Sequence, residues 1–246
     1  MHALPSNCTR QAFGLYREIN YFCASTSNPL QQPTGSIMPL KIAAALLALL
    51  ASTAVSAQAT LSVEGCNIRR GTFCVNMNLN GAELPGANLA NSQFSRSRLA
   101  GANLEGAVLD EAALSSTVLT GARLAEASLR KVNARGANFE QADLRGANLE
   151  NAVLQNAKMA GARLDGARLV NADMSNVRLE GATLDGADLT RANLRAAELR
   201  GASLKGANLG GANLTRADLT DADLSGAKLD GANFFGTQTG GCIGCP

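Results

Sequence analysis

Residues 101–109 read Gly-Ala-Asn-Leu-Glu-Gly-Ala-Val-Leu, and this short stretch contains the pattern that organises the chain. An alanine and a leucine recur together every five residues, at 102 and 104 and again at 107 and 109. The same frame runs over residues 77–236 without an insertion or deletion and holds 32 five-residue units. Leucine occupies the central position of 26 units, and alanine stands two residues before the centre in 26 units. One repeated unit therefore accounts for most of the chain.

A period of five residues fits neither regular secondary structure. On an α-helix a step of five residues turns the chain by about 140°, so the leucines would scatter around the whole surface. On a flat strand an odd period would send successive Ala/Leu pairs to opposite faces. The pattern is satisfied if the chain bends at each unit boundary, where glycine often stands two residues after the centre, as at Gly81 and Gly86. We therefore expect a solenoid with every Ala/Leu pair directed inward.

These tandem Ala-(Asp/Asn)-Leu-x-x units resemble those of the pentapeptide repeat proteins. The resemblance implies an all-β fold, a right-handed quadrilateral β-helix with four units in each coil and about eight coils. It also implies that the Asp or Asn before each central residue lies on the outer wall. By the same reasoning Leu164 faces the axis, and a charge placed there would unfold the rod. The positions on which the outer-wall expectation rests are Asn103, Asn138, Asp143 and Asp188.

Residues 38–59 have the pattern of a secretory signal peptide. A short segment that includes Lys41 precedes the ten apolar or small residues 42–51, and small residues follow them. Ten apolar residues are too few to span a bilayer. Cleavage before Gln58 and cleavage before Thr60 are both compatible with the sequence. We therefore expect a periplasmic or secreted protein with no membrane anchor after cleavage.

Residues 1–37 precede this signal and contain no periodic pattern. Two explanations stay open: the true start is Met38 rather than Met1, or the leader is unusually long. The remaining chain divides into an N-terminal cap over residues 60–76, the repeats over 77–236, and a tail over 237–246.

Four cysteines remain once the leader is removed, and they flank the repeats in two pairs. An even number of cysteines in an oxidising compartment favours disulfides. In a rod the two pairs lie at opposite ends, so the expected bridges join Cys66 to Cys74 and Cys242 to Cys245. A zinc site would need the two pairs close together, which a rod prevents. A redox-active Cys242-Ile-Gly-Cys245 motif is the other alternative, although no βαβ pattern surrounds it.

The composition offers little material for catalysis. The only histidine, His2, and both tyrosines, Tyr16 and Tyr21, lie in the leader. The exported chain would therefore lack the histidine that Ser-His-Asp and Cys-His catalysis require. No glycine-rich phosphate loop follows a strand, because the glycines keep the five-residue rhythm. We expect no enzyme activity, no cofactor and no metal site.

The charge balance bears on the partners that the chain could bind. The formal net charge of the whole chain is +2, and from Cys66 onward there are 19 basic and 18 acidic residues. This near-neutral balance does not predict nucleic-acid binding. The pentapeptide repeat family includes proteins that bind DNA gyrase by mimicking duplex DNA, and that role is the alternative function. Mimicry requires a strongly acidic rod, and export would separate the chain from gyrase.

Two opposite faces of the expected rod differ in charge. The arginine face consists of the outward positions of every fourth unit from the unit centred on 94, and its charges sum to +3. The acidic face consists of the outward positions of every fourth unit from the unit centred on 84, and it carries four basic and seven acidic residues. The arginine face could dock an unknown protein partner or let rods self-associate, with chance variation as the alternative. The basic residues of the arginine face are Arg96, Arg135, Arg195 and Arg216.

Overall fold

The computed structural model describes residues 62–246 and two short strands nearer the N-terminus. These strands, β1 (Cys8–Thr9) and β2 (Phe22–Cys23), pair antiparallel with Cys8 opposite Cys23. They lie in the unit Met1–Ala57, and the residues from 62 onward lie in the unit Gln58–Pro246. The signal peptide expected at 38–59 lies outside the described residues, as does all of 1–37 except the two strands.

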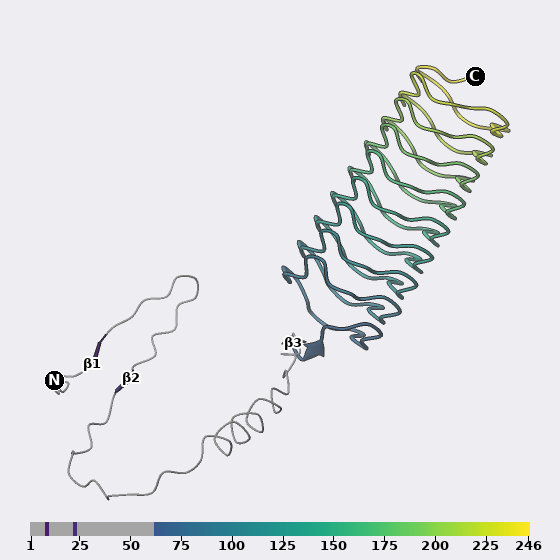
Figure 1. Cartoon of the computed structure of the whole chain (residues 1–246). Coiled ribbons are helices and arrows are strands. Elements are labelled where there is room, and N and C mark those ends of the chain that lie inside the picture. Colours follow the sequence, from purple (N-terminus) through teal and green to yellow (C-terminus); the bar gives the residue numbers. More distant parts are fainter. Residues whose placement is uncertain (1–7, 10–21, 24–61) are drawn as a thin grey trace, which may run out of the picture. The chain divides into compact units, whose positions relative to one another are not determined.

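Residues 62–246 form a solenoid of stacked, four-sided coils (Figure 1). Parallel β-bridges join residues 20 positions apart, from Phe73 with Gln93 at one end to Asp223 with Ile243 at the other. Twenty residues are four five-residue units, so each unit forms one side of a coil. The regular path therefore extends beyond 77–236 at both ends, and most of residues 237–246 continues the coil.

Backbone hydrogen bonds tie each coil to both of its neighbours. The amide of Leu164 donates to the carbonyl of Thr183 in the next coil at 2.6 Å. The amide of Asp143 donates to the carbonyl of Ala122 in the preceding coil at 2.9 Å. The same two bonds recur in unit after unit, so the stacking satisfies backbone groups that burial would otherwise leave unpaired.

The corner of each unit explains the glycines of the repeat. The second residue after each centre has a positive φ, for example 65° at Gly146 and 64° at Gly161. Glycine adopts this left-handed conformation without the steric cost that a Cβ atom adds. The corner is closed by a hydrogen bond such as that from the amide of Ala147 to the carbonyl of Leu144, at 3.1 Å.

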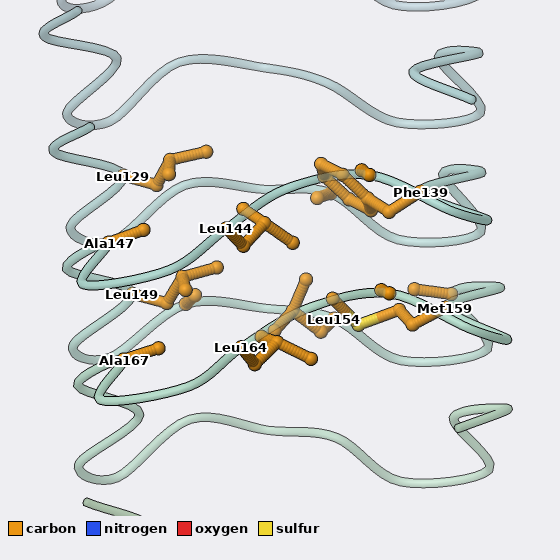
Figure 2. Close-up of a cluster of buried hydrophobic side chains, with 14 of the residues drawn as sticks. Leu129, Phe139, Leu144, Ala147, Leu149, Leu154, Met159, Leu164 and Ala167 are labelled. Atoms are coloured by element: carbon orange, nitrogen blue, oxygen red, sulfur yellow. The ribbon is translucent and has the colours of Figure 1, made fainter. Parts of the chain in front are cut away.

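The core is a column of leucine and alanine side chains along the axis. Leu129 and Leu149 point inward from the same side of successive coils, and Leu164 points inward from a neighbouring side (Figure 2). Phe139 and Met159 fill the same column from the opposite side. All five are fully buried. The expected β-helix and the axial position of Leu164 are thus confirmed, because every unit bends at its corner and turns its Ala/Leu pair inward.

In many units an outward Asp or Asn accepts a hydrogen bond from the backbone amide two residues later. The Asp218 carboxylate accepts hydrogen bonds from the amide of Thr220 at 2.9 Å and from its hydroxyl at 2.6 Å. These bonds lower the pKa of Asp218, with the Thr220 hydroxyl as the largest cause. Asn138 accepts in the same way from the amide of Glu140 at 2.9 Å. Where Asp or Asn precedes the centre, its side chain therefore stabilises the local turn, as in other side-chain turns.

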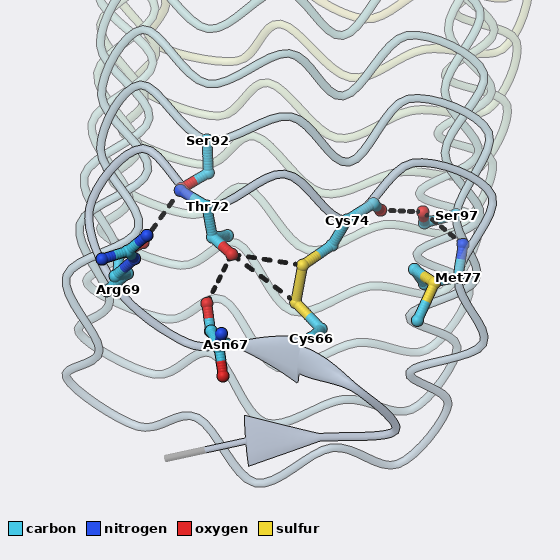
Figure 3. The surroundings of a disulfide bond; sticks show 8 residues. All are labelled: Cys66, Asn67, Arg69, Thr72, Cys74, Met77, Ser92 and Ser97. Carbon is cyan, nitrogen blue, oxygen red and sulfur yellow. Dashed lines mark hydrogen bonds between the residues drawn. A yellow bond between two sulfur atoms is a disulfide. The ribbon is translucent and has the colours of Figure 1, made fainter. Parts of the chain in front are cut away.

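The N-terminal end of the solenoid is covered by a two-stranded hairpin. Strand β3 (Ser62–Val63) pairs antiparallel with β4 (Cys66–Asn67). A disulfide joins Cys66 to Cys74, with Cα atoms 5.6 Å apart and both residues buried. The hydroxyl of Thr72 lies 3.2 Å from the Cys74 sulfur and donates to the carbonyl of Asn67 (Figure 3).

The last described coil differs from the coils beneath it. Its axial side chains, such as Leu229 and Phe234, are only partly buried, whereas Leu209 and Leu214 one coil earlier are fully buried. A second disulfide, Cys242–Cys245, closes a short loop there with Cα atoms 5.9 Å apart.

Candidate interaction surface

The arginine face carries charges that nothing in the described part of the chain neutralises. Its four arginines are exposed, and within residues 62–246 none of their side chains makes an ion pair or a hydrogen bond. Parallel bridges hold the backbone beneath them, so the four side chains project from one rigid surface. These residues are Arg96, Arg135, Arg195 and Arg216.

The charged residues of the arginine face are of the kinds that protein-binding surfaces favour. Its outward positions hold arginine, asparagine, serine and glutamine but no lysine and no glutamate, and Asp173 is its one acid. Interface centres are enriched in arginine and depleted in lysine, glutamate and aspartate. Burial raises the pKa of Asp173, but hydrogen bonds from Gln155, Ser175 and Asn193 outweigh it and leave this pKa lowered. The one acid is therefore ionised at neutral pH and engaged with neutral neighbours.

The corners of the arginine face depart from the glycine rule of the fold. Six of its eight left-handed corner residues are not glycine, the exceptions being Gly136 and Gly236. Arg96 and Arg216 occupy two of these corners, with φ of 61° and 60°. A residue with a side chain is strained there by about 1 kcal/mol or more. Stability alone would favour glycine at these two corners. Six of the eight corners on the face that starts at the unit centred on 89 are also not glycine, and they include Lys131 and Arg191, so such corners are not confined to the arginine face.

The acidic face shows the opposite arrangement. Each of its four cations lies within ion-pair distance of a carboxylate on the same face, from 2.5 Å for Arg145–Asp143 to 4.0 Å for Arg163–Asp165. The side-chain hydrogen bond from Arg145 holds the pKa of Asp143 below its ordinary value. Of the eight corners from Gly86 to Gly226, only Glu126 is not glycine. The other two ion pairs of the acidic face are Arg123–Glu105 and Lys205–Asp223.

Three acids of the acidic face have no ion-pair partner among residues 62–246. Glu83 accepts a hydrogen bond from the amide group of Asn103 at 2.8 Å. Asp185 accepts from the hydroxyl of Ser203 at 2.5 Å, and Glu126 makes neither contact. The net charge of −3 on this face is therefore the charge of these three side chains.

The described residues contain neither a cluster of metal-ligating side chains nor a membrane-spanning helix. No group of three or more His, Cys, Asp or Glu side chains in the described residues is placed to hold a metal ion. The same part of the chain has no helix that is long and apolar enough to cross a bilayer. Cys242 and Cys245 are joined to each other, and the structure keeps them apart from the Cys66–Cys74 pair by the length of the solenoid.

Sequence reasoning located the two faces but missed the pairing of their charges and the corner conformations. The ion pairs join residues two apart, as in Arg145–Asp143, or 18 apart, as in Arg123–Glu105. Both spacings follow from the 20-residue coil, so they could have been sought once four units were assigned to each coil. The non-glycine corners were also visible as breaks in the glycine rhythm, of which Arg96 is one.

A coil of four pentapeptides with an Ala/Leu core and parallel bridges defines a β-solenoid of the quadrilateral type. The family model of the pentapeptide repeats matches eight copies between residues 74 and 236. The chain belongs to the pentapeptide repeat family, and its solenoid is a right-handed β-helix.

Two solved structures illustrate the likeness. One is HetL, a pentapeptide repeat protein involved in heterocyst differentiation regulation in Nostoc sp. PCC 7120. It is 33% identical over 70% of this chain and 87% of its own, with a TM-score of 0.60. The other is a trypsin-treated form of QnrB1, a plasmid-mediated fluoroquinolone resistance protein. It is 20% identical over 68% of this chain and 88% of its own, with a TM-score of 0.56, and this likeness shows the fold alone. No protein of curated function matches the sequence significantly.

Proposed function

We propose that this protein is an exported, non-catalytic interaction module that docks a protein partner on its arginine face. The observation that carries the proposal is the set of four exposed arginines without ion-pair partners in residues 62–246. On the acidic face every cation lies beside a carboxylate, whereas the four arginines of the arginine face share their surface with one acid, Asp173. Arg98, Arg168 and Arg191 on the two remaining faces also have no ion pair within residues 62–246, so the arginine face is distinguished by gathering its unpaired charges beside a single acid. An arginine forms bidentate hydrogen bonds with a carboxylate, and a rigid sheet removes the cost of ordering the backbone when it binds.

The strained corners are compatible with the same proposal, although Lys131 and Arg191 occupy corners of the same kind on another face. Arg96 and Arg216 stand where glycine would stabilise the coil. Side chains kept at a cost in stability are found at functional sites. HetL, to which the chain is similar, is described as a protein involved in regulation, a role compatible with binding other proteins.

Export is the second component of the proposal. It rests on the signal pattern of residues 38–59 and on the even cysteine count after it. It places the working protein in the periplasm or outside the cell. The intact mass of the natively expressed protein tests it. We expect a chain that starts at Gln58 or Thr60 and lacks four hydrogens, and an uncleaved, fully reduced chain would contradict export.

The docking proposal is tested by capture from envelope extracts on immobilised protein. Replacing all four arginines by glutamine should abolish salt-sensitive capture, because exposed ion pairs form the contact and are screened by salt. A matched control replaces Arg123, Arg145, Arg163 and Lys205 of the acidic face by glutamine and should leave capture intact. Undiminished capture by the arginine-face variant would contradict the docking proposal.

Gyrase binding through DNA mimicry is the alternative, and the charges of the rod do not favour it. Duplex DNA carries one negative charge per roughly 1.7 Å of its axis. The acidic face carries a net charge of only −3 along the whole rod, and the arginine face is positive. The likeness to QnrB1, at 20% identity, extends to the fold and not to the function.

A further inference from the structure

The two charged faces match each other in the spacing of their unpaired charges. Along the arginine face, Arg135 lies two coils beyond Arg96, and Arg195 lies three coils beyond Arg135. At the usual spacing between neighbouring strands, these separations are about 9 Å and about 14 Å along the axis.

The unpaired acids of the acidic face have nearly the same separations. Glu126 lies two coils beyond Glu83, and Asp185 lies three coils beyond Glu126. These separations are about 10 Å and about 14 Å at the same strand spacing. They also occur in the same order along the chain, two coils and then three.

We propose that the arginine face docks the acidic face of a second copy of this protein, with both rods pointing in the same direction. This inference rests on the proposed docking role of the arginine face and names its partner. Units 94 and 84 are two units apart in a four-unit coil, so the two faces are on opposite sides of one rod. A second copy displaced sideways therefore brings its acidic face against the arginine face of the first.

The order of the separations selects the orientation of the two rods. In the parallel orientation the second copy is shifted along the axis by half a coil. Each of Arg96, Arg135 and Arg195 then lies level with one unpaired acid to within about 1 Å along the axis. Those acids are Glu83, Glu126 and Asp185, in the same order. In the antiparallel orientation the two-coil separation of one face would lie opposite the three-coil separation of the other. The central arginine and the central acid would then be out of register by one coil, or about 5 Å. Only the parallel orientation brings all three charges level along the axis.

The fourth arginine is an internal control. Arg216 lies one coil beyond Arg195, where the facing surface offers Lys205 and Asp223, which already bond each other at 3.3 Å. The register gives Arg216 no free acid. It should therefore contribute nothing to the contact between copies, although it belongs to the arginine face.

The contact uses two different faces of each copy, so it leaves both outer faces free. Such heterologous contacts do not close and produce rows of molecules rather than dimers. Exposed ion pairs are individually weak and are screened by salt, so rows should form at high protein concentration and low ionic strength.

Sedimentation velocity of the purified mature protein at several concentrations and salt levels tests the proposal. We expect a sedimentation coefficient that rises with concentration at low salt and stops rising at high salt. The rise should disappear in the variant R96Q/R135Q/R195Q and in the variant E83Q/E126Q/D185N, and R216Q should behave as the parent. A parent that stays monomeric, or an acidic-face variant that assembles like the parent, overturns the proposal.

Variants with exchanged charges provide the decisive test. The variant R96E/R135E/R195E is acidic on both faces and E83K/E126K/D185K is basic on both, so each alone should stay monomeric. An equimolar mixture should assemble, because every contact in an alternating row then joins opposite charges. A mixture that stays monomeric while circular dichroism shows both folded overturns the inference. If the arginine variants lose capture of another envelope protein but the parent never self-associates, docking stands and the second copy is not the partner.

Discussion

The arginine face and the acidic face are built from the same coil, yet they differ in the pairing of their charges and in the residues at their corners. On the acidic face every cation has a carboxylate beside it and seven of eight corners are glycine. On the arginine face no arginine has an ion pair with residues 62–246, and six of eight corners carry a side chain. The repeat fixes the interior, whereas the outward residues are free to differ from face to face.

The largest expected effect would show that the two faces share one interior. Leu164 lies beneath the acidic face and Leu154 beneath the arginine face, and both are fully buried. Replacing either leucine by aspartate places an unpaired charge on the axis and should cost more than about 4 kcal/mol, enough to unfold the rod. Thermal melts followed by circular dichroism should show the same loss for both. A parent-like melt of either variant would contradict its axial position.

The disulfides should give the next largest effect. Cys66–Cys74 closes a loop of eight residues and both its residues are buried, whereas Cys242–Cys245 closes a loop of three on the partly buried last coil. Removing the first pair as Cys66→Ser/Cys74→Ser should cost about 2–3 kcal/mol by the loop-entropy relation. Cys242→Ser/Cys245→Ser should cost less. Urea unfolding of the two double variants measures the difference, and equal losses would argue against this ranking.

Exchange of corner residues should sharpen the comparison between the faces. Arg96→Gly and Arg216→Gly relieve strained corners, so each should raise the free energy of unfolding by about 1 kcal/mol, and Arg96→Gly should also weaken partner capture. The reverse change on the acidic face, Gly166→Arg, should lower stability by a similar amount. Arg135→Gly is the matched control, because Arg135 does not have a positive φ and should give no gain. Loss of stability in the two corner variants would show that these corners are not strained.

The smallest effect concerns the response of one acid on each face to pH and salt. A hydrogen bond from Arg145 is the largest cause that lowers the pKa of Asp143 from its ordinary 3.8. The pKa of Asp173 is also lowered, against burial, but by hydrogen bonds from the neutral Gln155, Ser175 and Asn193. A lowered folded-state pKa adds stability above the ordinary value, and this stability is lost as the pH falls through the folded-state pKa. Protonation of either acid should therefore lower the free energy of unfolding as the pH falls below about 3.8.

Salt should separate the two acids. Added salt screens the charge of Arg145 and should move the pKa of Asp143 back toward its ordinary value, while the pKa of Asp173 should barely change. Carboxyl carbon NMR titrations at low and high salt measure both values. An equal response of the two acids would mean that charge pairing does not distinguish the faces at these positions.

The interior could be predicted almost completely from the sequence. A five-residue period has few ways to bury its large residue, so Leu164 and Leu149 were assigned to the axis without a structure. The continuation of the coil to Ile243 was not predicted, because Thr239 and Gly244 replace the leucines and the backbone bridges alone maintain the path. The hairpin of β3 and β4 was also missed, since two-residue strands leave no periodic signal.

The two faces were only partly predictable. Their net charges could be counted, because each residue's face follows from its place in the 20-residue coil. The pairing of those charges depends on which side chains meet across a coil boundary. Arg123, for example, reaches Glu105 one coil earlier. The strain at Arg96 depends on a backbone angle that the residue itself does not favour, and only the geometry of the coil imposes it.

The repeating register of the coil restricts how the length of this chain can change. Loss of one pentapeptide from the middle of the rod would leave the Ala/Leu column continuous, because every unit is equivalent on the inside. It would also turn everything beyond the deletion by a quarter of a coil, so Arg195 and Arg216 would leave the face that holds Arg96 and Arg135. Loss of four pentapeptides would shorten the rod by one coil and keep all four arginines together. Deletions and duplications that preserve the arginine face must therefore come in whole coils.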